Sequence, residues 1–320
     1  MISPEIQRRL LSLMLKIRKA EEKIVEVYAK ERQIRTPTHL SIGQEAVAAG
    51  LCAALNPDDQ IFTGHRCHAA YLARGGAFYP FFAELCGRVD GSCAGRAGSA
   101  HLSEPALGMY ASPILGAMIP VAVGAGLSFQ MDRTRQVAAA LFGDAAIEEG
   151  VFAESLNFAV TKKLPVLFVC ENNLYSTHSP LSVRQPPSPI YERIKNPELK
   201  TRQIDGNDAA LVYQTISETL EEIRSGSGPQ FIECLTYRIR EHVGPLFDYD
   251  RGYRSRDEVE SWIKLCPVES FRRRLIDEEI AGETEIFQEE QRWQDEADRA
   301  YAQALESPWP AAGELLRNVD

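Results

Sequence analysis

The sequence lacks several features that would place it in a membrane or outside the cell. Its 320 residues contain no uninterrupted run of 18 apolar residues, which is about the length that a membrane-spanning helix needs. The first residues carry charges among their apolar positions and form no clean secretory leader. Seven cysteines form neither a C-x-x-C pair nor a Cys/His zinc pattern, which is typical of reduced thiols. We therefore predict a cytoplasmic protein without membrane contact.

An excess of positive charge is also missing. The chain has 35 Lys and Arg against 45 Asp and Glu, a formal net charge of −10, which argues against a nucleic-acid-binding protein. Residues 276–305 contain ten acidic residues and only two arginines. This acidic segment has two interpretations, as solvated helix faces or as a docking surface for a partner subunit or a basic carrier-binding domain. We favour solvated helix faces.

The remaining pattern predicts an α/β protein with a mostly parallel central sheet and helices on both faces. A buried strand over 137–144, an amphipathic helix over 147–163 and a strand over 165–173 form a parallel crossover unit. Further helices are expected over 5–31, from a Ser41 cap to before Asn56, and over 208–224, with a strand over 230–238. We expect an α/β domain over 1–265, whose residues 1–35 serve packing or subunit contact, and an acidic helical extension over 266–320.

Polar residues follow both strands of the crossover unit. Asp144 ends the first strand after Gly143, and Asn173 ends the second. The carboxyl ends of adjacent parallel strands form the edge at which open α/β sheets bind ligands. Carboxylate and amide oxygens suit Mg²⁺ or Ca²⁺, and a bound diphosphate would add two more oxygens. The alternative is that Asp144 only caps the following helix and Asn173 starts a turn.

The stretch GDAAIEEGVFAESLNFAVTKKLPVLFVCENNLY resembles the thiamine-diphosphate signature, a G-D-G followed at this spacing by N-N. Together with HLSIGQEAVAAGLCAALNPDD, GRAGSAHL, ILGAMIPVAVGAG and TYRIREHVG, it resembles the alpha subunit of the 2-oxo acid dehydrogenase first component over nearly the whole chain. That family includes pyruvate, branched-chain and acetoin types. The resemblance implies the thiamine-diphosphate-binding fold, thiamine diphosphate with Mg²⁺, and a beta subunit in an α2β2 heterotetramer. A lipoyl-bearing acyltransferase is a further expected partner.

The resemblance also assigns roles to individual residues. It implies that the metal is held by Asp144, Asn173 and the backbone oxygen of Tyr175. The diphosphate would be held by Arg66 and by the backbone N–H groups of Ala145 and Ala146, since a guanidinium suits phosphate. The residue pattern by itself also predicts that these two alanines lead into the crossover helix, whose free N–H groups favour phosphate.

Further site residues follow from the same resemblance. His65 and His68 flank Arg66 in FTGHRCH, and Pro113 and Leu115 belong to the loop expected against the aminopyrimidine. His242 is expected to be catalytic and to contact the cofactor, and His68 is a second catalytic candidate. His39 and His101 also occupy family histidine positions, where each has a structural alternative. The glutamate that tautomerises the cofactor comes from the beta subunit in this family.

Three positions depart from the family pattern. Ala145 replaces the second glycine of G-D-G, Met118 stands where many members have Gln, and Arg240 replaces a histidine. The loop over 241–254 contains no serine, so phosphorylation of this loop is not expected. The implied activity is decarboxylation or cleavage of a 2-oxo acid or acetoin-like substrate, with transfer of the acyl group to a lipoyl carrier. Two alternatives remain open, a non-oxidative carboligase or transketolase-like half-enzyme and a non-catalytic partner subunit.

Overall fold

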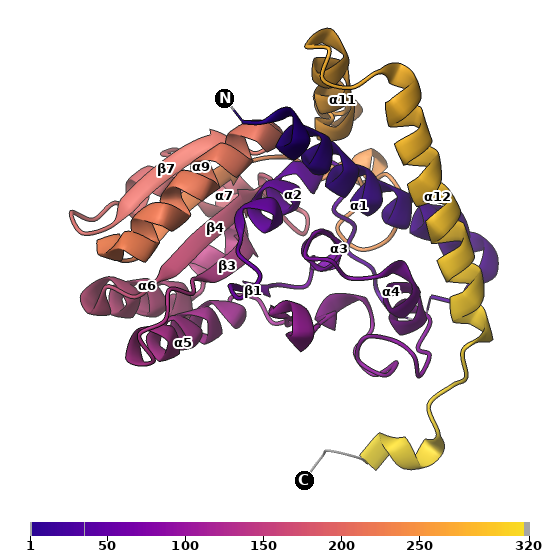
Figure 1. Ribbon diagram of the computed structural model, residues 1–320, viewed down its shortest axis with the longest axis horizontal. Coiled ribbons are helices and arrows are strands. Elements are labelled where there is room, and N and C mark those ends of the chain that lie inside the picture. Colours follow the sequence, from indigo (N-terminus) through magenta and orange to yellow (C-terminus); the bar gives the residue numbers. More distant parts are fainter. Residues whose placement is uncertain (1, 35, 317–320) are drawn as a thin grey trace.

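The computed structural model describes residues 2–34 and 36–316 (Figure 1). Residues 1, 35 and 317–320, which belong to the predicted end segments, lie outside this description. The described chain builds a six-stranded parallel sheet in the order β2-β1-β3-β4-β8-β7. Its strands are β1 (Gln60–Thr63), β2 (Met109–Ala111), β3 (Ala138–Gly143), β4 (Val166–Asn172), β7 (Lys200–Asp205) and β8 (Gln230–Leu235).

Both faces of this sheet are buried by helices. In β3, Ala139 and Leu141 pack into a core shared with α2 (Glu45–Ala54) and α9 (Ala209–Glu222). Ala138, Ala140 and Phe142 pack into the opposite core, shared with α5 (Met118–Met131) and α6 (Gly150–Lys162). Alternate residues of one strand thus enter two hydrophobic cores, as a parallel sheet requires. The predicted α/β fold class is confirmed.

The predicted crossover unit is present, with one correction at its centre. β3 and β4 pair in parallel register, with Gly143 opposite Glu171. A 3-10 turn over Asp144–Glu148 separates β3 from α6, which begins at Gly150. The extended backbone of Glu149, with φ −76° and ψ 133°, separates the turn from the helix. Ala145 and Ala146 therefore belong to the turn and do not lead directly into the crossover helix.

The predicted Ser41 cap is wrong. α2 begins only at Glu45, after Gln44. The main-chain N–H of Ser41 instead donates to both carboxylate oxygens of the buried Glu21, each at 2.8 Å. Its carbonyl accepts from the Gln44 amide at 2.7 Å. Ser41 thus anchors the preceding loop to α1 (Pro4–Glu31).

The acidic C-terminal segment folds against the N-terminal helix. α11 (Pro267–Asp277) is followed by α12 (Glu283–Glu306), which runs alongside α1 and packs on α4 (Phe78–Leu85) (Figure 1). Lys19 and Lys23 of α1 pair with Glu290 and Asp298 at 2.7 and 2.9 Å. Part of the acidic charge is therefore neutralised within the chain. Among the described helices, none combines the length and the apolar character needed to cross a bilayer.

The remaining elements are short and connect these layers. They include α3 (His68–Ala73), α7 (Leu181–Arg184), α8 (Ile190–Arg193) and α10 (Arg256–Ile263). β5 (Tyr175–Ser176) and β6 (Ser179–Pro180) form a small antiparallel hairpin directly after β4. This hairpin and α7 return the chain to the carboxyl edge of the sheet, where α7 contacts Asp144.

Candidate active site

A cavity lies at the carboxyl ends of β1, β3 and β4. Ten of the twelve residues that the sequence assigns to metal binding, cofactor binding or catalysis line it: His65, Arg66, Leu115, Gly143, Asp144, Ala145, Ala146, Asn173, Tyr175 and His242. They come from segments far apart in the sequence, and the parallel sheet brings them to one edge. Pro113 and His68 do not line it.

The strand alternation of β4 determines which asparagine faces the cavity. Asn172 turns to the opposite side, where its amide donates to Glu233 Oε1 at 2.7 Å. Asn173 lines the cavity, and its amide donates to Gln44 Oε1 at 3.0 Å. The Asn173 Oδ1 atom accepts from the Tyr175 amide at 3.2 Å and retains a second lone pair for a ligand.

Asp144 is buried, with 1% of its surface exposed. Its carboxylate pairs with the guanidinium of Arg184, which also pairs with Glu148. Burial raises the pKa of Asp144, while the Arg184 charge acts in the opposite direction. A buried carboxylate needs a cationic partner, so this position suits a positive charge. With the amide oxygen of Asn173 nearby in the same cavity, the available ligand atoms fit a hard cation such as Mg²⁺.

Tyr175 follows Asn173 in the hairpin strand β5. Its phenol donates to Glu258 Oε1 at 2.7 Å. Because this hydrogen bond occupies the hydroxyl, a main-chain contribution at the cavity agrees better with the structure than a side-chain one. This is the kind of contribution that the resemblance implies for Tyr175.

The cavity also carries hydrogen-bond donors. Arg66 donates through Nη1 to the Leu40 carbonyl at 2.5 Å, and burial lowers its pKa to about 10, so it is protonated at neutral pH. Gln44 is fully buried, and its Nε2 atom has no hydrogen-bond partner. A cation and an unpaired donor in one cavity complement an anion such as a diphosphate. Ala145 does not adopt a positive φ, so its methyl group is compatible with the turn.

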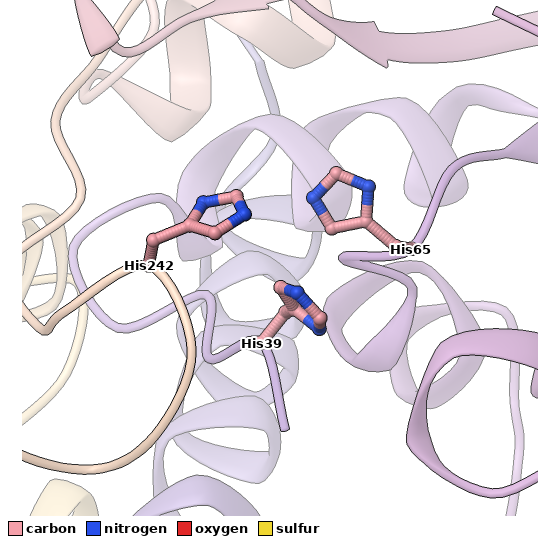
Figure 2. Close-up of side chains that lie close together, drawn as sticks. All are labelled: His39, His65 and His242. Carbon is pink, nitrogen blue, oxygen red and sulfur yellow. The ribbon is translucent and has the colours of Figure 1, made fainter. Parts of the chain in front are cut away.

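Three histidines lie close together, and two of them, His65 and His242, line this cavity; Figure 2 shows the three rings near one another. His39 comes from the loop before α2, His65 from the loop after β1, and His242 from the loop after β8. Main-chain hydrogen bonds join the first and last loops, from the Ile239 amide to the Ile42 carbonyl at 3.1 Å and from the Gly244 amide to the Thr38 carbonyl at 2.8 Å. These bonds hold the two loops in a fixed relation.

The three imidazoles are neutral. Burial, followed by the nearby Arg66 charge, lowers the pKa of His39 to about 2, of His65 to about 4 and of His242 to about 3. At neutral pH each ring therefore keeps one nitrogen lone pair, which accepts a hydrogen bond or binds a metal.

His68 was a catalytic candidate, and the structure places it elsewhere. It is fully buried, with Nδ1 3.2 Å from Glu21 Oε1 and Nε2 2.7 Å from Ser99 Oγ. Both ring nitrogens are thus engaged by protein atoms, and we correct its role to a structural one. The helix α3 begins at His68, and its orientation directs the His68 side chain into the core.

Two other expected positions also lie outside the cavity. Pro113 is exposed, whereas the next two residues, Ile114 and Leu115, do line the cavity. His101 is exposed, and its Nδ1 lies 3.2 Å from the Ala97 carbonyl oxygen. Of the three residues that depart from the family pattern, Met118 lines the cavity. The guanidinium carbon of Arg240 lies 4.2 Å from the centre of the Phe247 ring.

Among the cavity-lining residues that the sequence did not single out, Gln44 and Glu171 contact or adjoin predicted site residues. Gln44 bonds to Asn173, and Glu171 precedes the two asparagines at the end of β4. Burial raises the pKa of Glu171 to about 7, opposed by the Arg66 charge. Their only sequence signal is position, since Gln44 lies in HLSIGQEA with His39 and Glu171 lies in CENN with Asn173.

Comparison with known proteins agrees with this site. The sequence profile of the family described as Dehydrogenase E1 component matches residues 12–312. The chain is 35% identical over 309 residues to the alpha subunit of acetoin:2,6-dichlorophenolindophenol oxidoreductase of Bacillus subtilis (strain 168), covering 96% of this chain and 91% of the relative.

Two further relatives are named as subunits of the pyruvate dehydrogenase E1 component. The alpha subunit of Rhizobium meliloti (strain 1021) is 34% identical and covers 96% of this chain and 87% of the relative. The mitochondrial alpha-2 subunit of Arabidopsis thaliana is 35% identical, with 96% and 77% covered. With its profile match spanning nearly all of the sequence, the chain belongs to the dehydrogenase E1 component family and is similar there to alpha subunits.

Proposed function

We propose that this chain is the alpha subunit of a thiamine-diphosphate-dependent dehydrogenase that acts on a 2-oxo acid or an acetoin-like substrate. The observation that carries the proposal is the position of Asp144 and Asn173. They end adjacent parallel strands and face one cavity together with Arg66. Oxygen ligands for a cation and a guanidinium for an anion within one cavity are what a metal–diphosphate group requires.

Each end of the group has residues suited to hold it. Asp144, Asn173 and the main-chain oxygen of Tyr175 would hold Mg²⁺. Arg66 and the main-chain N–H groups of Ala145 and Ala146 would hold the diphosphate, and the unpartnered Gln44 Nε2 is a further donor. When bound, thiamine diphosphate supplies the nucleophilic carbon and the electron sink of the reaction.

The residues of this chain would orient the reactants and handle protons. Ile114 and Leu115 line the cavity and are 67% and 39% exposed, so they offer an apolar support for the thiamine ring system. Neutral His65 and His242 present lone pairs that accept a hydrogen bond from a substrate hydroxyl. His242, on the loop after β8, is the residue that we propose to be catalytic.

We also propose a beta subunit as partner in an α2β2 assembly, a lipoyl-bearing acyltransferase as acceptor, and a cytoplasmic location. Large apolar side chains left in solvent at a cavity favour contact with another chain, and Ile114 fits that description. The relatives named above are themselves alpha subunits. The buried cysteine thiols agree with a reducing compartment.

The test is calorimetric titration of thiamine diphosphate with Mg²⁺ into this chain co-purified with its beta subunit. The Asp144→Ala variant should lose metal-dependent binding, because it removes the buried carboxylate. Asp295→Ala, which removes an exposed acid on α12, is the matched control and should bind like the wild type. An assembled complex that binds no thiamine diphosphate would overturn the proposal and favour the non-catalytic alternative.

If binding is established, a screen of 2-oxo acids and acetoin with and without a lipoyl acceptor separates the remaining activities. Substrate-dependent reduction of the acceptor supports the dehydrogenase. Substrate turnover that joins two carbon fragments and does not depend on the lipoyl acceptor would instead identify the non-oxidative carboligase alternative.

A further inference from the structure

His39 and the two cavity-lining histidines, His65 and His242, form a compact cluster of nitrogen ligands. Each of His39, His65 and His242 offers one ring nitrogen, and these three atoms all lie within 4.8 Å of one another. The ring centroids are 4.5 Å apart for His39 and His65, 5.1 Å for His39 and His242, and 5.4 Å for His65 and His242. Figure 2 shows the rings converging from three separate loops.

The loops that carry these rings are restrained. Two main-chain hydrogen bonds join the His39 loop to the His242 loop. Arg66, which follows His65, donates a hydrogen bond to the carbonyl of Leu40, which follows His39. All three rings are partly buried. Hydrogen bonds between the three loops therefore keep the rings close together.

The cluster also contains a buried ring nitrogen that makes no hydrogen bond. The Nδ1 atom of His39 is buried and has no hydrogen-bond partner, and a buried polar atom without a partner costs free energy. The three rings are neutral at physiological pH, as described above, so their nitrogen lone pairs are available without the release of a proton.

This ligand set differs in kind from the oxygen ligands at Asp144 and Asn173. Neutral imidazole nitrogens suit Zn²⁺, Cu²⁺, Ni²⁺ and Co²⁺, whereas Mg²⁺ prefers oxygen. Three histidines with one open position form a well-known catalytic-type zinc arrangement. Around zinc, with Zn–N distances of about 2.1 Å, the nitrogens would be roughly 3.4 Å apart. The three nitrogens, all within 4.8 Å of one another, would therefore have to approach by up to about 1.4 Å.

We propose that His39, His65 and His242 form a second metal site, which binds one divalent transition-metal ion of the zinc class. Because His65 and His242 line the cavity, the open coordination position is reached from it. The charge of Arg66 acts on all three rings and lowers the pKa of each. The fourth ligand is therefore expected to be an anion, such as hydroxide or chloride, which offsets that charge.

The test measures binding of Zn²⁺ and Co²⁺ to the untagged chain co-purified with its beta subunit, without thiamine diphosphate. We expect one Zn²⁺ per alpha chain by calorimetry and metal analysis, and a visible Co²⁺ spectrum typical of tetrahedral nitrogen ligation. His65→Phe removes one ligand and keeps a ring of similar size. Its affinity for Zn²⁺ should fall by more than the roughly 10–100-fold loss that follows removal of an outer-shell partner.

His101→Gln is the matched control, because His101 lies outside both the cluster and the cavity. It should leave the Zn²⁺ affinity unchanged. Wild-type-like melting of His65→Phe shows that it is folded, and His242→Gln gives an independent second variant. Binding of Zn²⁺ that persists in both variants, or that excess Mg²⁺ removes, would place the ion on the oxygen ligands and overturn the proposal. So would the absence of binding by the wild type.

The readout needs neither cofactor nor turnover. Failure of thiamine diphosphate to bind would therefore leave the metal site standing. Conversely, a complex that binds thiamine diphosphate but no Zn²⁺ would overturn the metal site and leave the proposed function intact.

Discussion

The guanidinium of Arg184 pairs with the buried carboxylate of Asp144, 40 residues away along the chain. Arg184 ends α7, and its side chain is itself only 10% exposed. A positive charge from the chain thus occupies one side of the carboxylate that we propose to bind Mg²⁺. Arg184 compensates Asp144 when no metal is bound, and a metal ion would take over part of that role.

Replacing Arg184 with Gln should therefore destabilise the metal-free protein and increase the stabilisation that it gains from bound metal. We expect the free energy of unfolding without metal to fall by up to about 3 kcal/mol, because a buried carboxylate loses its partner. Addition of Mg²⁺ with thiamine diphosphate should then raise the melting temperature more in the variant than in the wild type. Arg299→Gln, on an exposed position of α12, is the control. Equal gains in melting temperature for Arg184→Gln and the wild type would contradict the prediction.

A second prediction concerns the loop that carries His242. Asp248 is 1% exposed and contacts two arginines, with Oδ2 3.3 Å from Arg238 Nη1 and Oδ1 2.6 Å from Arg254 Nε. Asp248→Asn leaves two buried guanidinium groups without their charge partner, which costs about 3–5 kcal/mol. We expect faster hydrogen exchange throughout residues 240–253.

The control for this change lies in the same loop. Asp250 is exposed, so Asp250→Asn should leave both the exchange rates and the free energy of unfolding close to those of the wild type. Similar exchange in the two variants would show that Asp248 does not hold the loop.

The sequence predicted the helices and strands that have a long hydrophobic pattern. It also predicted the site residues that belong to a recognisable motif. The crossover unit and α1 have strong periodic patterns, and both are present. β2 has three residues and β7, KTRQID, is largely polar with no fully buried residue, so neither has a detectable hydrophobic pattern. Their strand conformation depends on pairing with β1 and β8, which no local pattern encodes.

The same distinction applies to the site. Asp144 and Asn173 follow apolar strands, so their common edge could be inferred from parallel pairing. The burial of His68 could not, because it depends on the position of Glu21, 47 residues earlier in the sequence. The contact of Arg184 with Asp144 and the meeting of His39 with His242 likewise depend on tertiary loop paths.

A third prediction concerns Gly43, in the loop between His39 and α2. Its φ is +100°, and an added Cβ would lie 2.5 Å from the Tyr237 carbonyl oxygen. Gly43→Ala should lower the free energy of unfolding by at least about 1–3 kcal/mol, from backbone strain together with this contact. Gly282→Ala is the control, because its φ is −81° and nothing lies within 4 Å of its added Cβ. Urea unfolding of both variants gives the comparison, and equal midpoints would contradict the prediction.

The last prediction is a pH dependence that arises from Lys16 on α1. Its ammonium group is buried and donates to the carbonyls of Leu72 and Gly76 at 3.1 and 2.7 Å. Burial lowers the pKa of Lys16 from 10.5 to about 8. Between these values the unfolded chain binds more protons than the folded protein, so the contribution of Lys16 to the free energy of unfolding rises with pH. Below about pH 8 the cost of burying the charge is constant.

Lys16→Met removes this titrating group, so the wild type should gain stability relative to the variant as the pH rises from 8 to 10. The gain follows from about 1.4 kcal/mol per pKa unit and should amount to about 2 kcal/mol over that interval. Denaturant unfolding at several pH values measures the difference between the two curves. Lys264→Met, at an exposed position after α10, should run parallel to the wild type. If the Lys16→Met curve also ran parallel, the lysine would titrate alike in the folded and unfolded chains, and its burial would carry no proton linkage.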